Sequence, residues 1–92
     1  MARNVGDGYE TIGWRLSADK CFRYEKLITF FHLLDIERMK AVVITDKGVF
    51  AYNLSGGVLK EIAVDDCLES RLEIICQSVG STWDADLMDC LV

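Results

Sequence analysis

Apolar positions in this chain follow a helical spacing in one segment and a strand-like alternation in several others. Between residues 21 and 34, four apolar residues recur at i, i+3, i+4 and i+7. They are Leu27, Phe30, Phe31 and Leu34. This spacing places the four side chains on one stripe of a helix, and such a stripe must be covered by another element. We therefore predict a helix from about Cys21 to Leu34, with Asp19 as its N-cap.

Five further segments have the composition of β-strands. They are residues 9–17, 39–45, 48–54, 58–64 and 71–78. The segment 39–45 is apolar at both parities, which predicts a central strand that is buried on both faces. Gly13 interrupts the first segment, where it is compatible with a β-bulge. Turn signals at 46–48 and 55–57 join the three middle segments into a meander.

The last twelve residues return to a helical pattern, with Trp83, Leu87 and Leu91 at i, i+4 and i+8. The predicted order is β-α-β-β-β-β-α, an α+β fold in which helices cover one face of a small antiparallel or mixed sheet. Residues 1–8 are predicted to form a flexible polar tail. Residues 9–92 are predicted to form one domain, because a chain of 92 residues is too short for two cores.

The charge balance narrows the classes of partner. The chain has 10 Lys and Arg against 15 Asp and Glu, a formal net charge of −5. This balance argues against nucleic acids and anionic membrane surfaces, because both are bound through clustered cations. No apolar run reaches the roughly 18 residues of a membrane span, and the N-terminal segment does not resemble a secretory signal. We expect a cytoplasmic protein; the sequence leaves its oligomeric state open.

Four cysteines are dispersed along the chain, at positions 21, 67, 76 and 90. In a cytoplasmic protein they should be reduced, and none has a second cysteine close enough for a paired zinc-binding motif. We interpret them as small apolar side chains. The alternative hypothesis is a freestanding metal-binding domain that uses Cys67, Cys76 and nearby carboxylates as ligands.

No arrangement of residues in the sequence indicates catalysis. The phosphate-binding pattern GxxxxGK[ST] is absent, and Gly56 and Gly57 fit a hairpin turn instead. His32 is the only histidine, so a His-based metal triad cannot be assembled, and a Ser-His-Asp triad would depend on this one helical residue. Asp65 and Asp66 lack the spacing of a calcium loop and fit a solvated acidic loop. We therefore predict a protein that is not an enzyme, with no catalytic residue, no cofactor and no metal ligand.

Charged residues cluster at the beginning of two predicted strands. Arg38 and Lys40 begin the central segment, and Arg71 and Glu73 begin the last one. One interpretation is that they are solvated strand-end charges that limit edge-to-edge pairing of sheets. The other is that the arginines hold acidic loops or a partner surface through bidentate pairing. These four residues are the candidate interaction surface.

Several motifs, in their order and spacing, resemble the C-terminal domain of CobW-type P-loop GTPases. The resemblance rests on "CF" before the helix, on "FFHLLDIERMKAVVITDKGVFAYN" and on "LESRLEII", and it covers nearly the whole chain. The matching positions are Phe22, Arg38, Lys40, Ala41, Glu69, Ser70, Arg71 and Glu73.

This resemblance implies an accessory domain of a larger metallochaperone. In the family, the Walker motifs, the guanine-specificity motif and a cysteine-rich metal-binding motif belong to the N-terminal half, and none of them occurs here. The resemblance therefore implies a non-catalytic domain for protein interaction or for regulation of metal delivery. Its partners would be the GTPase domain of the parent protein, a metalloprotein client, or both. Some members carry a histidine-rich metal segment near this domain, and a chain with one histidine departs from them.

Overall fold

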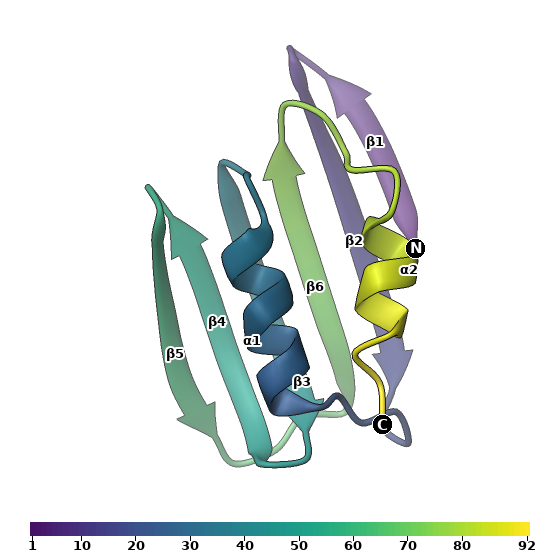
Figure 1. The fold of residues 1–92 in the computed structure, drawn as a ribbon, viewed down its shortest axis with the longest axis vertical. Coiled ribbons are helices and arrows are strands. Elements are labelled where there is room, and N and C mark those ends of the chain that lie inside the picture. The colour runs from purple at the N-terminus through teal and green to yellow at the C-terminus, as the bar shows by residue number, and fades with distance from the viewer.

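Six strands form one sheet in the computed structural model, which describes all residues from Met1 to Val92. The strands are β1 (Ala2–Gly6), β2 (Tyr9–Ser17), β3 (Arg38–Thr45), β4 (Gly48–Ser55), β5 (Val58–Val64) and β6 (Glu69–Cys76). Their order across the sheet is β1-β2-β6-β3-β4-β5 (Figure 1). Every pair of neighbours is antiparallel. The predicted α+β class is confirmed, and the last strand in sequence lies near the middle of the sheet.

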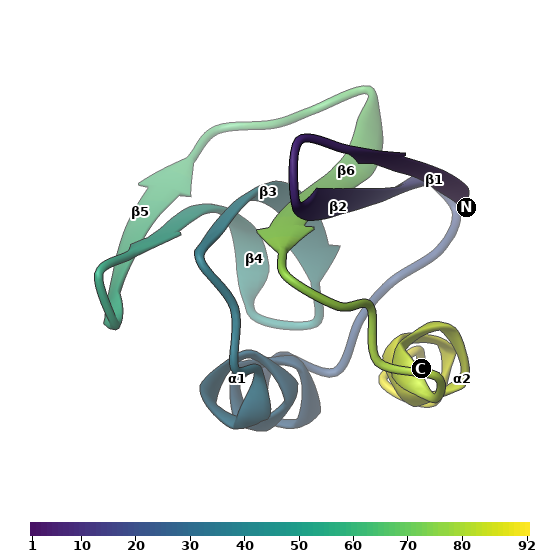
Figure 2. The same ribbon diagram turned by 90° about the horizontal axis from the view of Figure 1, so that it is seen from above.

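Both helices, α1 (Tyr24–Leu33) and α2 (Trp83–Met88), lie on the same face of the sheet. Figure 2 shows them next to each other below the strands, with no element on the opposite side. We refer to that uncovered side as the open face. Helices confined to one face of an antiparallel sheet give a two-layer α+β architecture. Neither helix is long and apolar enough to cross a membrane.

A single hydrophobic core fills the space between the sheet and the helices. The predicted stripe of α1 supplies Leu27, Phe30 and Phe31, all buried, and Leu34 packs against them at the end of the helix. The ring of Phe31 meets the ring of Tyr52 of β4 edge to face, with centroids 5.1 Å apart. Each fully buried Leu or Phe stabilises the fold by about 1.5–3 kcal/mol. The sheet contributes Ile12, Trp14, Met39, Ala41, Val43, Leu72, Ile74 and Cys76 to this core.

The central position predicted for residues 39–45 is confirmed, but only one face of β3 is fully buried. Met39, Ala41 and Val43 point toward the helices and are at most 5% exposed. Val42 and Ile44 point to the other side and are half-buried. The second set of apolar residues therefore belongs to the open face and not to a second core layer.

The predicted flexible tail, residues 1–8, contains strand β1. β1 pairs with β2 through the two-residue turn Asp7-Gly8, with Gly6 opposite Tyr9. Asp7 and Gly8 have φ angles of 52° and 81°. Positive φ at both turn residues is what a type I′ hairpin requires, and Asp-Gly is a sequence that favours it. The element order is therefore β-β-α-β-β-β-β-α.

The β-bulge predicted at Gly13 of β2 is absent. Gly13 pairs with residues on both neighbouring strands, so the strand is regular there.

α1 begins at Tyr24, three residues later than predicted, and its cap comes from a turn that is distant in sequence. The carboxylate of Asp46, between β3 and β4, accepts a hydrogen bond of 2.9 Å from the backbone N–H of Tyr24. Asp19 instead accepts a hydrogen bond from the hydroxyl of Ser17, so the N-cap predicted for Asp19 is wrong. The first N–H groups of a helix lack partners within the helix, and here the β3–β4 turn supplies one.

α2 is shorter than predicted, because the helix ends in a turn at residues 89–90 and the last residues form a separate segment, 90–92. Backbone hydrogen bonds join this segment to residues 21–23. Leu91 pairs with Phe22, and Phe22 pairs on its other side with Thr45 at the end of β3. The fully buried Phe22 thus lies between β3 and the C-terminal segment, and it fixes the point from which α1 starts.

The edge strand β5 is attached to the helical layer through Glu61. The carboxylate of Glu61 accepts hydrogen bonds from the hydroxyls of Tyr24 (2.6 Å) and Tyr52 (2.7 Å). The hydrogen bond to Glu61 raises the pKa of Tyr24. Burial, together with the same kind of hydrogen bond, raises the pKa of Tyr52. One carboxylate therefore connects α1, β4 and β5.

Candidate functional site: the open face of the sheet

The register of the sheet brings the four residues of the predicted interaction surface together. Side chains that stand opposite each other on antiparallel strands point to the same face. Lys40 of β3 stands opposite Glu73 of β6, and Arg38 stands opposite Ile75. Arg71 lies two residues before Glu73 and therefore points to the same side. All four residues lie on the open face, on two adjacent strands.

Arg15 of β2 is a further cation of this face and stands directly opposite Arg71. Its guanidinium donates to both carboxylate oxygens of Glu69, with a shortest N–O distance of 2.8 Å. This hydrogen bond raises the pKa of Arg15 and lowers that of Glu69. Arg38, Lys40 and Arg71 form no ion pair. Like charges opposite each other on neighbouring strands are destabilising, and only Arg15 of this pair is neutralised within the molecule.

A hollow of about 300 Å³ lies among these side chains. The open-face side chains that line it are Arg15, Lys40, Val42, Arg71 and Glu73. A smaller hollow of about 70 Å³ lies next to it, beside Arg38. Planar guanidinium groups bind carboxylates through two parallel hydrogen bonds. A shallow hollow with three cations and one carboxylate at its rim is therefore suited to receive an acidic side chain.

The part of the open face over β4 and β5 is mainly apolar. Ile62 of β5 stands opposite Ala51 of β4. Ile62 is 66% exposed and Val58 is 57% exposed, although both belong to a regular strand. The apolar side chains of this region are Val42, Ile44, Val49, Ala51, Val58, Ile62 and Val64.

Positive charge is concentrated on the open face of an otherwise acidic molecule. Five of the ten basic residues point to this face, against two of the fifteen carboxylates, Glu69 and Glu73. The face therefore carries a formal charge of +3, and the rest of the chain carries −8. We refer to these five basic residues as the cationic set; they are Arg15, Arg38, Lys40, Lys60 and Arg71.

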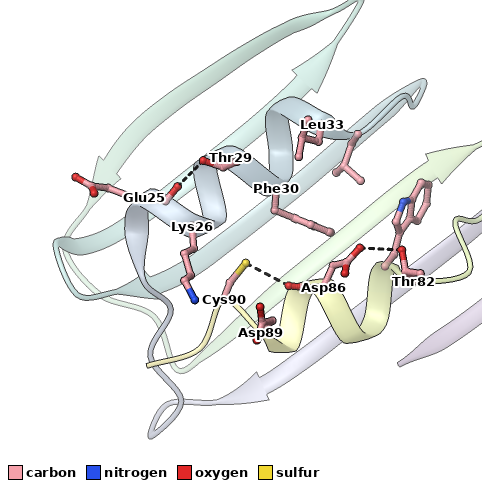
Figure 3. Close-up of a pocket in the computed structure, with 11 residues that line it drawn as sticks. Glu25, Lys26, Thr29, Phe30, Leu33, Thr82, Asp86, Asp89 and Cys90 are labelled. Carbon is pink, nitrogen blue, oxygen red and sulfur yellow. Dashed lines mark hydrogen bonds between the residues drawn. The ribbon is translucent and has the colours of Figure 1, made fainter.

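A second concavity, of about 670 Å³, lies between α1 and α2 (Figure 3). Its lining combines apolar and charged side chains from both helices: Glu25, Lys26, Phe30, Leu33, Leu34, Trp83, Asp86 and Asp89. At one end, the thiol of Cys90 donates a hydrogen bond to the backbone carbonyl of Asp86, 3.4 Å away. Burial raises the pKa of this thiol, so Cys90 is not an activated nucleophile. The groove can receive apolar side chains, and it contains no recognisable catalytic group.

The ligand pair of the metal-binding alternative, Cys67 and Cys76, cannot bind one metal ion. Cys67 lies two residues before β6, and Cys76 is the last residue of that strand. An extended chain rises about 3.3 Å per residue, which separates the two by roughly 30 Å. Burial raises the pKa of both thiols. No group of three or more His, Cys, Asp or Glu side chains is placed to hold a metal ion. The alternative hypothesis is therefore wrong for this pair of ligands.

Other polar residues considered from the sequence are engaged locally or solvated. Asp66 accepts a hydrogen bond of 2.7 Å from the backbone N–H of Cys67, and Glu69 is held by Arg15. His32 is exposed on the surface of α1. None of them joins a second functional group in a catalytic arrangement.

The residues that carry the family resemblance divide into two groups. Phe22, Ala41 and Ser70 are buried and belong to the scaffold. The charged members all lie on the open face: Arg38, Lys40, Glu69, Arg71 and Glu73. The motif "ESR" thus alternates between the two roles, because Glu69 and Arg71 point outward while Ser70 points inward.

Sequence reasoning missed Arg15, Lys60 and Ile62. Arg15 lies between the apolar residues Trp14 and Leu16, and this alternation indicates an outward side chain. Its position beside Arg71 depends on the order of the strands, which the sequence pattern does not contain.

Comparison with known proteins confirms the resemblance. The chain is 31% identical over 86 residues to the zinc chaperone YeiR of Escherichia coli (strain K12), and the alignment covers 89% of this chain. It is a distant homologue of a segment of this zinc chaperone. The chain spans one quarter of the length of that relative, as expected for one domain of a larger protein. No family model and no solved structure match the chain.

Proposed function

We propose that this distant homologue of one segment of a zinc chaperone is a non-catalytic accessory domain of a CobW-like metallochaperone. In this proposal it mediates the protein contacts through which the metallochaperone delivers metal in the cytoplasm. The observation that carries the proposal is the open face, where the charged residues of the family resemblance converge on an uncovered sheet. Small domains that lack a catalytic site act through the surfaces that their fold presents.

The turns of the domain support a role without nucleotide chemistry. A phosphate-binding loop needs several backbone N–H groups, a lysine and a following helix. Gly56 and Gly57 form a two-residue turn between β4 and β5, with Ser55 opposite Val58. This turn leads into a strand and not into a helix. Nucleotide binding would therefore belong to the remainder of the metallochaperone.

The first test uses the isolated chain. It should neither bind nor hydrolyse GTP, because no loop of the domain can hold a triphosphate and its overall charge repels one. Titration calorimetry with GTP and magnesium, followed by a phosphate-release assay, measures both properties. Measurable GTP turnover by these 92 residues would overturn the proposal.

The second test uses YeiR as the host protein. Removal of the segment that matches this chain should leave nucleotide binding intact and impair zinc transfer to an acceptor protein. Insertion of this chain in its place should restore the transfer, whereas a flexible linker of equal length should not. Unimpaired zinc transfer by the shortened protein would refute the accessory role.

Zinc content provides a third and independent test. After size exclusion in a mild chelator, the isolated chain should retain no stoichiometric zinc, because its cysteines do not converge on one point. Stoichiometric zinc that survives this treatment would revive the metal-binding alternative with a different ligand set.

A further inference from the structure

We propose that the open face binds an acidic surface of a separate protein, and that this surface also carries exposed apolar side chains. Arg71 and Lys40 would receive carboxylates of the partner, and Ile62 would contact its apolar side chains. The inference rests on the proposed function, because it names the contact surface of the accessory domain and the chemistry of its partner.

Charge is unbalanced at the centre of the open face. Arg71 stands between Arg15 and Val42 on the neighbouring strands. Glu69 neutralises Arg15 and Glu73 stands opposite Lys40, whereas Arg71 faces no carboxylate on either neighbouring strand and forms no ion pair. An arrangement of like charges opposite each other costs stability in the free domain. A carboxylate placed over the hollow between them removes that cost and gains bidentate hydrogen bonds.

An exposed apolar area lies beside the cations. Ile62 and Val58 are more than half exposed on the same face, and Ala51 and Val42 extend the apolar strip toward Arg71. Five strands about 4.8 Å apart and about eight residues long, at about 3.4 Å per residue, give a face of roughly 650 Å². Each partner in a standard protein–protein interface buries about 600–1,000 Å², and the face reaches the lower end of this range. The face is thus large enough for one specific contact.

The charge distribution disfavours a nucleic acid as the occupant. Affinity for nucleic acids comes from many cations that neutralise phosphates, and this face has four basic residues that form no ion pair. Single-stranded nucleic acids are bound largely by stacking on aromatic side chains. The single aromatic side chain on this face is Tyr9, at the far end of β2. The positions next to the cationic set carry none; they are Thr11, Gly13, Ser17, Val42, Ile44, Ala51, Asn53, Ser55 and Ile75.

A second copy of this chain is also a poor occupant. Its acidic helical layer has the complementary charge, but a contact between the open face of one copy and the helical face of the next is heterologous. Such contacts form open-ended assemblies unless the rotation between copies closes a ring. An open face that binds another protein avoids this outcome.

The binding test uses the isolated domain and a defined probe. The probe is a twelve-residue peptide of alternating Glu and Val, and its matched control is a peptide of alternating Lys and Val. In NMR titrations, the Glu-Val peptide should shift the amide signals of the open face, including those of Lys40, Arg71 and Ile62, and added salt should weaken the effect. No shift with the Glu-Val peptide, or equal shifts with a DNA duplex, would overturn the inference.

Matched variants separate binding from folding. R71Q combined with K40Q should weaken binding of the Glu-Val peptide by about tenfold or more, while the melting temperature changes little, because R71Q relieves the repulsion from Arg15 and K40Q removes the charge opposite Glu73. R23Q removes an exposed arginine at the start of α1, away from the open face, and should leave binding unchanged. I62S should weaken binding, whereas L33S, at an exposed leucine of α1, should not. Equal affinities for the double variant and R23Q would contradict the inference.

Cross-linking identifies the natural partner by its chemistry. A carbodiimide joins lysine amines directly to carboxylates, so Lys40 and Lys60 should be linked to Asp or Glu of another protein in a cell extract. These links should survive nuclease treatment and disappear in the R71E/R38E variant. Links from Lys40 or Lys60 to acidic residues of a second copy of this chain would instead identify a self-association surface and overturn the inference.

The YeiR chimera distinguishes this inference from the proposed function. If the unaltered chain restores zinc transfer and the R71E/R38E chain restores it equally well, the accessory function stands and the open-face inference fails. If the unaltered chain does not restore zinc transfer, while the acidic peptide still binds the open face, the accessory function fails and the binding surface stands.

Discussion

The hydroxyl oxygen of Ser70 accepts a hydrogen bond from the backbone N–H of Ile44, 2.9 Å away, inside the sheet. The ladder between β3 and β6 ends at the pair of Val42 and Arg71, so Ile44 finds no backbone acceptor on β6. Ser70 is fully buried and supplies the missing acceptor from its side chain. This hydrogen bond holds the two strands together beside the hollow of the open face.

Substitution S70A should destabilise the domain by about 1–3 kcal/mol, because it leaves the N–H of Ile44 without an acceptor. Urea denaturation followed by circular dichroism measures the change. S55A removes an exposed hydroxyl at the end of β4 and should change the stability by less than about 0.5 kcal/mol. If both variants unfold at the same urea concentration, the Ser70 hydrogen bond contributes nothing.

Substitution F31A should destabilise the domain by about 3–5 kcal/mol, because it leaves a cavity between α1 and β4. Phe31 is 2% exposed, whereas Leu33, two residues later on the same helix, is 80% exposed. L33A is therefore the matched control and should have little effect. If F31A lowers the free energy of unfolding in chemical denaturation by less than about 1 kcal/mol, the apolar stripe of α1 does not pack against the sheet in this way.

Acidification should destabilise the fold through Glu10 and Glu69. Hydrogen bonds from Arg3 and from the backbone N–H of Val79 lower the pKa of Glu10, and the hydrogen bond from Arg15 lowers that of Glu69. A carboxyl with a lowered pKa in the folded state stabilises the fold above its unfolded pKa of about 4.3. That contribution is lost as the pH falls through the lowered value.

The measurement is the melting temperature between pH 7 and pH 2.5. It should fall below about pH 4.5, and the fall should be smaller in the E10Q/E69Q variant. D35N/E37Q removes two carboxylates that form no ion pair and controls for the change in net charge. Parallel curves for the double variant and the unaltered chain would exclude these two ion pairs as the cause.

The four thiols should differ in reactivity in the folded state. Cys76 and Cys90 are buried, and their burial raises the pKa of both groups. Cys21 and Cys67 are half-buried and more accessible. A chromogenic disulfide reagent should therefore modify Cys21 and Cys67 well before the other two, with all four reacting at once in denaturant. Rapid modification of Cys76 or Cys90 without denaturant would indicate local opening of the core.

Local patterns in the sequence predicted most of the elements. The apolar residues recur with the helical period in α1, and with the period of a strand in β3, β4, β5 and β6. β1 was missed because all five of its residues are exposed, so it has no apolar periodicity. The turn Asp7-Gly8 was the available signal. The cap of α1 by Asp46 was not predictable from neighbouring residues, since it joins positions 22 residues apart.

The candidate site could be predicted only in part for the same reason. Arg38 and Lys40 lie on one strand, as do Arg71 and Glu73, and the period of two placed each pair on one face. Lys40 stands opposite Glu73 only because β3 pairs with β6. Arg15 lies on the same face beside Arg71 only because β2 pairs with β6. These pairings are properties of the whole fold.

The central position of β6 has a consequence for the synthesis of the chain. Before β6 emerges from the ribosome, the β1–β2 hairpin and the β3–β4–β5 meander have no strand to connect them. Pairing of β2 with β6 joins Trp14 to Leu72, a long-range contact that is slow to form. We therefore expect the nascent domain to remain in two pieces, with its apolar faces accessible to chaperones, until residue 76 is available. A fragment that ends at residue 68 should show no cooperative unfolding transition, whereas the full chain should show one.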